Sequence, residues 1–138
     1  MNKRIVKLGL VLSLLLSSSA FATSPSAEDV ELYIVTPADS ATVTSPVKIV
    51  FGLSGMGVAP AGVKRENTGH HHLLIDQDEL PEPGKPMGGN VRHFGGGQTE
   101  VELTLEPGEH TLQLILGDHF HIPHEPMVVS EKITIIVE

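Results

Sequence analysis

The stretch TEVELTLEPGEHTLQLILGD, residues 99–118, contains two alternating patterns separated by a Pro-Gly pair. On each side of that pair every second residue is apolar, and these residues are Val101, Leu103, Leu105, Leu112, Leu114 and Leu116. A period of two is the period of a β-strand that buries one face, whereas a helix has a period of 3.6 residues. The stretch therefore predicts two strands, at 99–105 and 110–117, with a turn between them.

Similar patterns predict strands on both sides of this stretch. The full expected set is 31–35, 47–53, 70–76, a short strand around 90–94, 99–105, 110–117 and 128–137. The connecting segments are rich in Gly, Pro and small polar residues, and no window after residue 22 has a clear helical stripe. About seven short strands at this spacing are typical of a sandwich. We predict an all-β fold, an immunoglobulin-like antiparallel β-sandwich, over residues 31–138.

The first 22 residues resemble a secretory signal peptide. Three basic residues precede an apolar run over 8–16, and Ala-Phe-Ala at 20–22 supplies the small residues that signal peptidase reads. The apolar run is too short to span a membrane. We expect cleavage after Ala22, a linker over 23–30, and a mature protein in the bacterial periplasm with no membrane attachment.

The composition argues against several classes of function. The chain has 9 Lys and Arg against 17 Asp and Glu, a formal net charge of −8, and no cysteine. Nucleic acid is not an expected partner, because its binders need a basic face. Without cysteine there is no disulfide, no thiolate chemistry and no lipidated cysteine. Any metal site must therefore use His, Met, carboxylate or backbone oxygen.

Six of the eight histidines lie in two segments, TGHHHLLID at 68–76 and GDHFHIPHEP at 117–126. In an immunoglobulin-like sandwich, the loops after the second, fourth and sixth strands meet at one pole. This topology brings both segments together and adds His93, which follows the short strand. His110 begins a strand at the opposite pole, where a surface or capping role is expected.

Strand alternation divides the triple histidine. His71 shares a face with Leu73 and Ile75, so it is expected to point into the sandwich, while His70 and His72 share the outer face. His119 and His121 form a second His-x-His pair if that segment is extended.

Two converging His-x-His pairs indicate a transition-metal site, because neutral imidazole nitrogen suits both Zn(II) and Cu(II). The candidate ligands are His70, His72, His93, His119, His121 and His124. The expected supporting residues around them are His71, Asp118 and Glu125, of which the two acids can fix imidazole tautomers. Solvated loop histidines that merely titrate near pH 6.5 are the alternative.

Three methionines, Met56, Met87 and Met127, lie near the Gly and Pro loops rather than at strand centres. A thioether that approached the histidines would favour Cu(I), and the alternative is that these side chains fill gaps in the core.

The segments GHHHLLID, HFGGGQTEVELTLEPGEHTLQLILGDH and HIPHEP together resemble a family of small bacterial exported domains of unknown function. The flanking segments TPADSATVTSPVKIVFGL and EKITIIVE are similar to strands of bacterial immunoglobulin-like extracellular domains. The resemblance covers about residues 31–138. It implies the fold but no activity.

The expected function is binding, buffering or delivery of copper or zinc by the histidine-rich pole. The alternative is a non-catalytic recognition module that binds a protein, a glycan or an anionic ligand there, with Lys64, Arg65 and Arg92 assisting. We expect no enzyme, because the sequence has no nucleophile elbow, HExxH or CxxC motif. A small metalloenzyme remains a minor alternative.

Overall fold

The computed structural model describes residues 22–138, so the expected signal peptide lies outside the described residues except for Ala22. The described residues form nine strands and no helix, and thus include no helix that could cross a membrane. The strands are β1 (Glu31–Thr36), β2 (Thr42–Val43), β3 (Val47–Ser54), β4 (Gly57–Val58), β5 (Thr68–Ile75), β6 (Arg92–His93), β7 (Glu100–Leu103), β8 (Gly108–Gly117) and β9 (Ile133–Val137).

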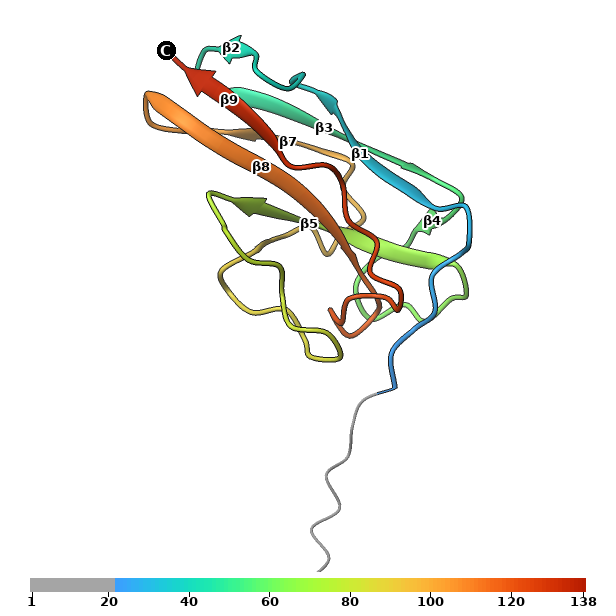
Figure 1. The fold of residues 1–138 in the computed structure, drawn as a ribbon. Helices are drawn as coiled ribbons and strands as arrows, with labels where there is room; N and C mark the ends of the chain where they lie inside the picture. The colour runs from blue at the N-terminus through green and yellow to red at the C-terminus, as the bar shows by residue number, and fades with distance from the viewer. Residues whose placement is uncertain (1–21) are drawn as a thin grey trace, which may run out of the picture.

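The strands form two sheets that pack face to face (Figure 1). The smaller sheet has the order β1-β3-β7, and the larger has the order β2-β9-β8-β5-β4, with β6 also paired to β5. The first, second and fifth expected strands thus share one sheet, and the third, sixth and seventh share the other. This partition is the one found in immunoglobulin-like sandwiches. The all-β sandwich prediction is confirmed.

The turn in the 99–118 stretch carries the chain from one sheet to the other, because β7 pairs with β3 whereas β8 pairs with β5 and β9. The alternation nevertheless buries the expected face. Leu103, Leu112, Leu114 and Leu116 are in the main core, and Val101 and Leu105 pack against its margin.

The main core lies between the sheets, where Phe51 of β3 packs on Phe94 with ring centroids 4.9 Å apart. A second, smaller apolar cluster lies on the opposite, outer face of the larger sheet. This outer cluster consists of Leu74, Val91 and Ile115, with Met87, Met127 and Val129 packed against it. Residues from the long connections 76–91 and 118–132 therefore cover the outer face of β5 and β8.

The last strand starts later than expected, and the short strands β2 and β4 are absent from the expected set. The last strand begins at Ile133 rather than at 128, because the preceding segment forms a single bridge to β8, between Ile115 and Val129. Side chains supply its other hydrogen bonds to β8: the Ser130 hydroxyl accepts the Leu114 N–H, and the Gln113 amide donates to the Ser130 carbonyl. The short strand β6 pairs with β5 and not with β7. This pairing takes His93 to the larger sheet.

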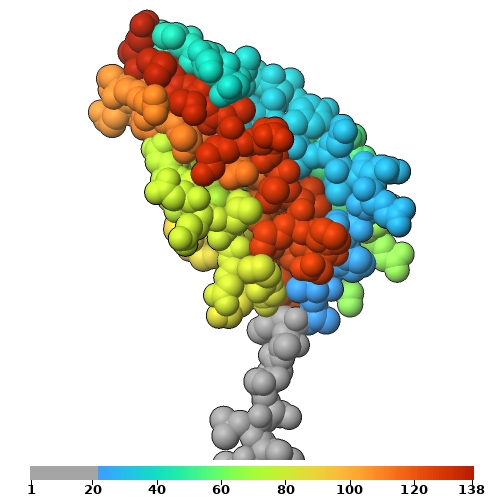
Figure 2. Space-filling model, viewed as in Figure 1, coloured from blue at the N-terminus to red at the C-terminus, as the bar shows by residue number. Residues whose placement is uncertain are grey.

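The N-terminal segment packs beside the connection between β8 and β9. The Ser26 N–H donates to the Glu125 carbonyl at 3.2 Å, and the Glu125 N–H donates to the Ser24 carbonyl at 3.0 Å. Figure 2 shows this blue segment against the red one at the lower end of the molecule. These two hydrogen bonds hold the connection between β8 and β9, which carries three histidines, against the N-terminal segment.

Candidate metal centre

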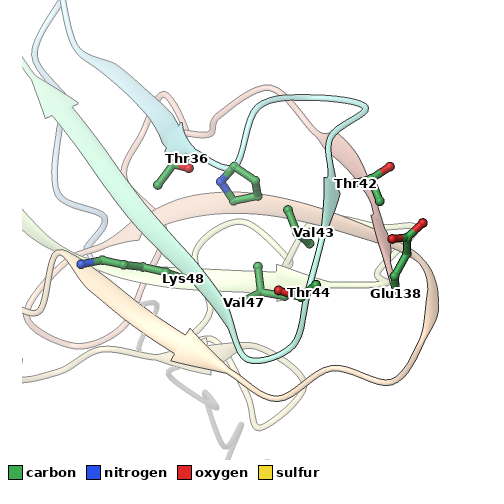
Figure 3. Close-up of a pocket in the computed structure, with 8 residues that line it drawn as sticks. Thr36, Thr42, Val43, Thr44, Val47, Lys48 and Glu138 are labelled. Atoms are coloured by element: carbon green, nitrogen blue, oxygen red, sulfur yellow. The ribbon is translucent and has the colours of Figure 1, made fainter.

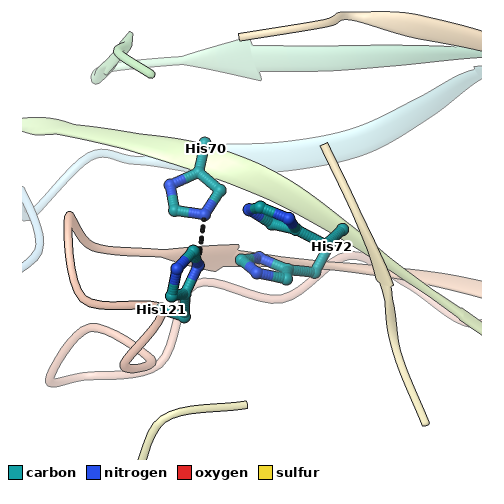
Figure 4. Close-up of side chains that lie close together, drawn as sticks. His70, His72 and His121 are labelled. Atoms are coloured by element: carbon teal, nitrogen blue, oxygen red, sulfur yellow. Dashed lines mark hydrogen bonds between the residues drawn. The ribbon is translucent and has the colours of Figure 1, made fainter. Parts of the chain in front are cut away.

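Four histidines from three parts of the chain converge on the outer face of the larger sheet. His70 and His72 come from β5, His93 comes from β6, and His121 comes from the connection between β8 and β9. One ring nitrogen from each lies within 4.8 Å of those of the other three. Figure 4 shows His121 facing the two β5 histidines, with His70 Nε2 3.0 Å from His121 Nδ1.

Strand geometry positions three of the four rings. Residues two apart on a strand point to the same side, so the His70 and His72 rings are adjacent, with centroids 4.6 Å apart. The pairing of β5 with β6 sets His72 directly opposite His93, with ring centroids 5.1 Å apart. As expected, His71 points the other way, and its ring lies 5.1 Å from that of Phe51 in the main core.

A tight turn positions the fourth ring. The buried Asp118 carboxylate accepts hydrogen bonds from the backbone N–H groups of Phe120 and Ile122, at 2.8 and 3.1 Å, and from the Ser24 hydroxyl at 2.8 Å. The His121 N–H donates to the Asp118 carbonyl at 2.9 Å. His121 has a φ of +64°, a conformation that is uncommon for residues other than glycine. The turn thereby returns the His121 ring to the β5 histidines.

Two glycines leave room for the rings. A Cβ on Gly95 would collide with the ring of His93. A Cβ on Gly117 would lie 2.6 Å from His72 Cε1 and 2.7 Å from the Met87 methyl carbon. The sites at 95 and 117 therefore exclude any larger residue unless the rings move.

Two of the four rings are buried, and among the described residues none of the four forms an ion pair with an acid. His70 and His72 are 0% and 1% exposed, His121 is half-buried and His93 is exposed. Nδ1 of His70 and Nδ1 of His72 have no hydrogen-bond partner among the described residues. A buried polar nitrogen without a hydrogen-bond partner lowers the free energy of unfolding by about 1–3 kcal/mol. These two rings therefore destabilise the metal-free protein.

Burial and mutual repulsion keep these imidazoles neutral. Burial, followed by the neighbouring His121 and His93, lowers the pKa of His70 to about 4. Burial, followed by His70 and His93, lowers the pKa of His72 to about 3. The pKa of His93 is lowered by burial and by His121. Neutral imidazole is the form that ligates a metal.

The donor set fits a transition-metal ion. Four neutral nitrogen donors suit Zn(II) or Cu(II), and a tetrahedral ion with bonds of about 2.0–2.1 Å would set its nitrogens roughly 3.4 Å apart. The cluster requires only side-chain adjustment on the order of 1 Å to reach that spacing. The exposed His93 ring gives an ion a route from solvent.

The other expected ligands lie outside this cluster. The His124 ring is buried with Nε2 3.2 Å from the Thr68 carbonyl and Nδ1 3.4 Å from the Leu116 carbonyl. The His119 ring stacks on Phe120, with centroids 4.2 Å apart, and its Nδ1 is 3.9 Å from the Asp118 carboxylate. The structure thus brings together His70, His72, His93 and His121.

Of the three expected supporting residues, Asp118, Glu125 and His71, only Asp118 lies beside the cluster. Asp118 shapes the turn beside the cluster, and its charge partly opposes the lowering of the His70 pKa. Glu125 is exposed and contacts the N-terminal segment through its backbone. His71 lies on the opposite face of β5. At the far end of β8, away from the cluster, His110 Nδ1 contacts Asp76 Oδ2 at 2.8 Å.

Sequence reasoning missed Gly95, Gly117 and Ser24 as residues that shape the centre. Gly95 lies in the run GGG at 95–97, which indicates a loop but carries no sign of a contact with a histidine. A glycine next to a histidine-rich segment is the available signal for Gly117, whereas Ser24 is 94 residues from its partner Asp118. No local pattern could link those two.

Pockets lie at both ends of the sandwich. One of about 380 Å³ lies at the end far from the histidines, where Thr36, Val47 and Glu138 contribute to its lining (Figure 3). Another of about 710 Å³ lies beside the Asp118 turn, with Lys64, Arg65 and His119 in its wall. Arg92 lines a different pocket, of about 370 Å³.

Together, the fold and the site define an all-β sandwich domain with a buried histidine cluster that can hold a metal ion. Residues 49–138 match the family described as a domain of unknown function, DUF4399. The chain belongs to this family, which confirms the expected membership of an uncharacterised domain family. No curated protein and no solved structure matches the chain.

Proposed function

We propose that this domain binds one divalent transition-metal ion, copper or zinc, between His70, His72, His93 and His121, and that it buffers or delivers the ion without catalysis. The observation that supports the proposal most strongly is the convergence of four ring nitrogens within 4.8 Å. Three of these rings are neutral at pH 7 because their pKa values are lowered.

Two features favour a carrier over a purely structural site. The exposed His93 and the half-buried His121 stand on the solvent side of the cluster, so an ion can exchange without unfolding of the sheet. The acidic chain, with a net charge of −8, attracts cations. The leader-like sequence at 1–22 supports a place for this activity in the periplasm.

Metal titration of tag-free protein pretreated with a chelator tests the proposal. We expect one Zn(II) or Cu(II) per chain, a raised Tm, because the ion binds only the folded state, and perturbed NMR signals from all four imidazoles. His121→Ala should weaken binding, whereas His119→Ala, in the same turn, should not. An unchanged Tm together with unperturbed imidazole signals would refute the metal site.

The pocket of about 710 Å³ supports a second candidate function, recognition of an anionic ligand. Lys64 and Arg65 supply positive charge in its wall, alongside the carboxylates of Glu66 and Asp118, and Phe120 supplies an aromatic surface. An aromatic sulfonate dye is a suitable probe. The dye should bind the wild type and lose affinity for the double variant Lys64→Gln/Arg65→Gln, and equal binding to both proteins would remove this candidate.

A further inference from the structure

One methionine extends from the connection between β5 and β6 to the edge of the histidine cluster. The Met87 N–H donates to the His121 carbonyl at 2.8 Å, so its backbone is tied to a residue of the cluster. Its methyl carbon lies 2.7 Å from the position that a Cβ on Gly117 would occupy. Cε1 and Nδ1 of His72 lie 2.6 and 3.1 Å from the same position. The thioether end of Met87 and the imidazole of His72 are therefore neighbours above Gly117.

The space that these two side chains share is available only because residue 117 is a glycine. Its partner across the sheet is His70, and paired residues of neighbouring strands point to the same face. A side chain at position 117 would therefore project into the histidine face of the sheet. The missing side chain lets the Met87 thioether reach His72, whose Nδ1 is buried and has no hydrogen-bond partner among the described residues.

The chemistry of a thioether differs from that of the four imidazoles. Sulfur of methionine is a soft donor that selects Cu(I), whereas imidazole suits both Zn(II) and Cu(II). Met87 is also only partly buried, and its unbranched side chain has three rotatable bonds. Its sulfur can thus move toward an ion held by the histidines without a change in the sheet.

We propose that Met87 supplies a thioether ligand to the ion held by the histidine cluster, and that the ion is therefore copper, bound as Cu(I) as well as Cu(II). This inference rests on the metal-binding function proposed above and adds the identity of the ion. The histidines hold either oxidation state, and the thioether favours Cu(I).

A matched control is available in the same structure. Met127 packs against the same outer cluster of Leu74, Val91 and Ile115, so Met127→Leu and Met87→Leu remove a thioether from similar surroundings. Leucine replaces methionine with little change in volume and a cost usually below about 1.5 kcal/mol. A general packing effect would therefore appear in both variants.

The experiment measures Cu(I) affinity by anaerobic competition with a chromophoric Cu(I) chelator, and Zn(II) affinity by a parallel competition. Met87→Leu should weaken Cu(I) binding by about tenfold or more and leave Zn(II) binding within about twofold. Met127→Leu should change neither. X-ray absorption of the Cu(I)-loaded wild type should show a sulfur neighbour that is lost in Met87→Leu.

Three results would overturn the inference. Unchanged Cu(I) affinity in Met87→Leu, equal weakening of Cu(I) and Zn(II), or a sulfur-free copper spectrum each shows that Met87 only fills space. In those cases the four-histidine site itself still stands, because Zn(II) binding and its loss in His121→Ala are measured separately. If the wild type binds neither ion, the proposed function and this inference both fail.

Discussion

Nε2 of His70 lies 3.0 Å from Nδ1 of His121, although 51 residues separate the two in the chain. When both rings are neutral, one of these nitrogens carries the proton and the other accepts it. For both nitrogens to ligate a metal ion, the ring that donates in this contact must carry its proton on its other nitrogen. The metal-free protein therefore holds these two nitrogens at 3.0 Å, close to the roughly 3.4 Å that tetrahedral ligation requires.

Gly117→Ala should displace the side chains of His72 and Met87 and so disrupt the metal centre. The added Cβ would lie 2.6 Å from His72 Cε1 and 2.7 Å from the Met87 methyl, so both side chains must move. We expect a loss of about 1–3 kcal/mol in the free energy of unfolding and weaker Zn(II) binding. Thermal unfolding and Zn(II) competition measure these effects. Gly89→Ala is the control, since a Cβ there meets nothing within 4 Å, and equal behaviour of the two variants would contradict the expectation.

The metal-free protein should lose stability as the pH falls from about 6.5 toward 3. Histidines of the unfolded chain bind protons near pH 6.5, but His70 does so only near 4 and His72 near 3 in the folded protein. The unfolded state therefore binds more protons in this window, and the free energy of unfolding decreases with falling pH. The loss should reach a few kcal/mol, on the order of 1.4 kcal/mol per pKa unit.

Urea unfolding at pH 7.5, 5.5 and 4.5 measures this dependence. His72→Gln removes one of the two groups and should flatten the curve, whereas His119→Gln should leave it unchanged. A curve for His72→Gln that parallels the wild type would show that His72 is not the source of the acid sensitivity.

Asp118→Ala should loosen the turn that carries His121. The substitution leaves the N–H groups of Phe120 and Ile122 without their carboxylate acceptor, at a cost of about 1–3 kcal/mol. We expect both lower stability and weaker metal binding. Ser24→Ala removes only the hydroxyl donor to the same carboxylate and should have a smaller effect on both. Wild-type Zn(II) affinity in Asp118→Ala would show that the turn does not position His121.

His71→Leu should leave the free energy of unfolding unchanged or raise it. Neither ring nitrogen of His71 makes a hydrogen bond of normal geometry, and the ring packs against Phe51 in the main core. Burial lowers the pKa of His71, and the backbone of Gln98 opposes this in part. A leucine of similar size removes the uncompensated polar atoms. Chemical denaturation and Zn(II) titration measure the outcome, and a large loss of metal affinity would instead assign His71 to the centre.

Alternation and turn residues were sufficient to predict the sandwich, because each strand buries one face in the main core. The same reasoning predicted that His70 and His72 would share a face opposite to His71, since a strand has a fixed period of two. The strand order then brought β5 and the β8–β9 connection together, whereas the pairing of β6 with β5 that sets His93 opposite His72 was not predicted. These features depend on local pattern and on a common topology.

The arrangement within the β8–β9 connection could not be predicted in this way. Asp118 folds residues 118–122 into a closed turn, so His121 and His119 do not form the extended pair that the spacing suggested. The His124 ring instead lies between the Leu116 and Thr68 carbonyls, to one of which a neutral ring can donate its single N–H. The approach of Met87 depends on the path of an irregular connection, which periodicity does not determine.

The most direct test of the central claim is the position of the ion itself. Crystals of metal-free protein soaked with Zn(II) should show one anomalous scattering peak, bonded at about 2.0–2.1 Å to the nitrogens of His70, His72, His93 and His121. A peak held instead by His119, His124 or surface carboxylates, or no peak at saturating Zn(II), would contradict the four-histidine centre.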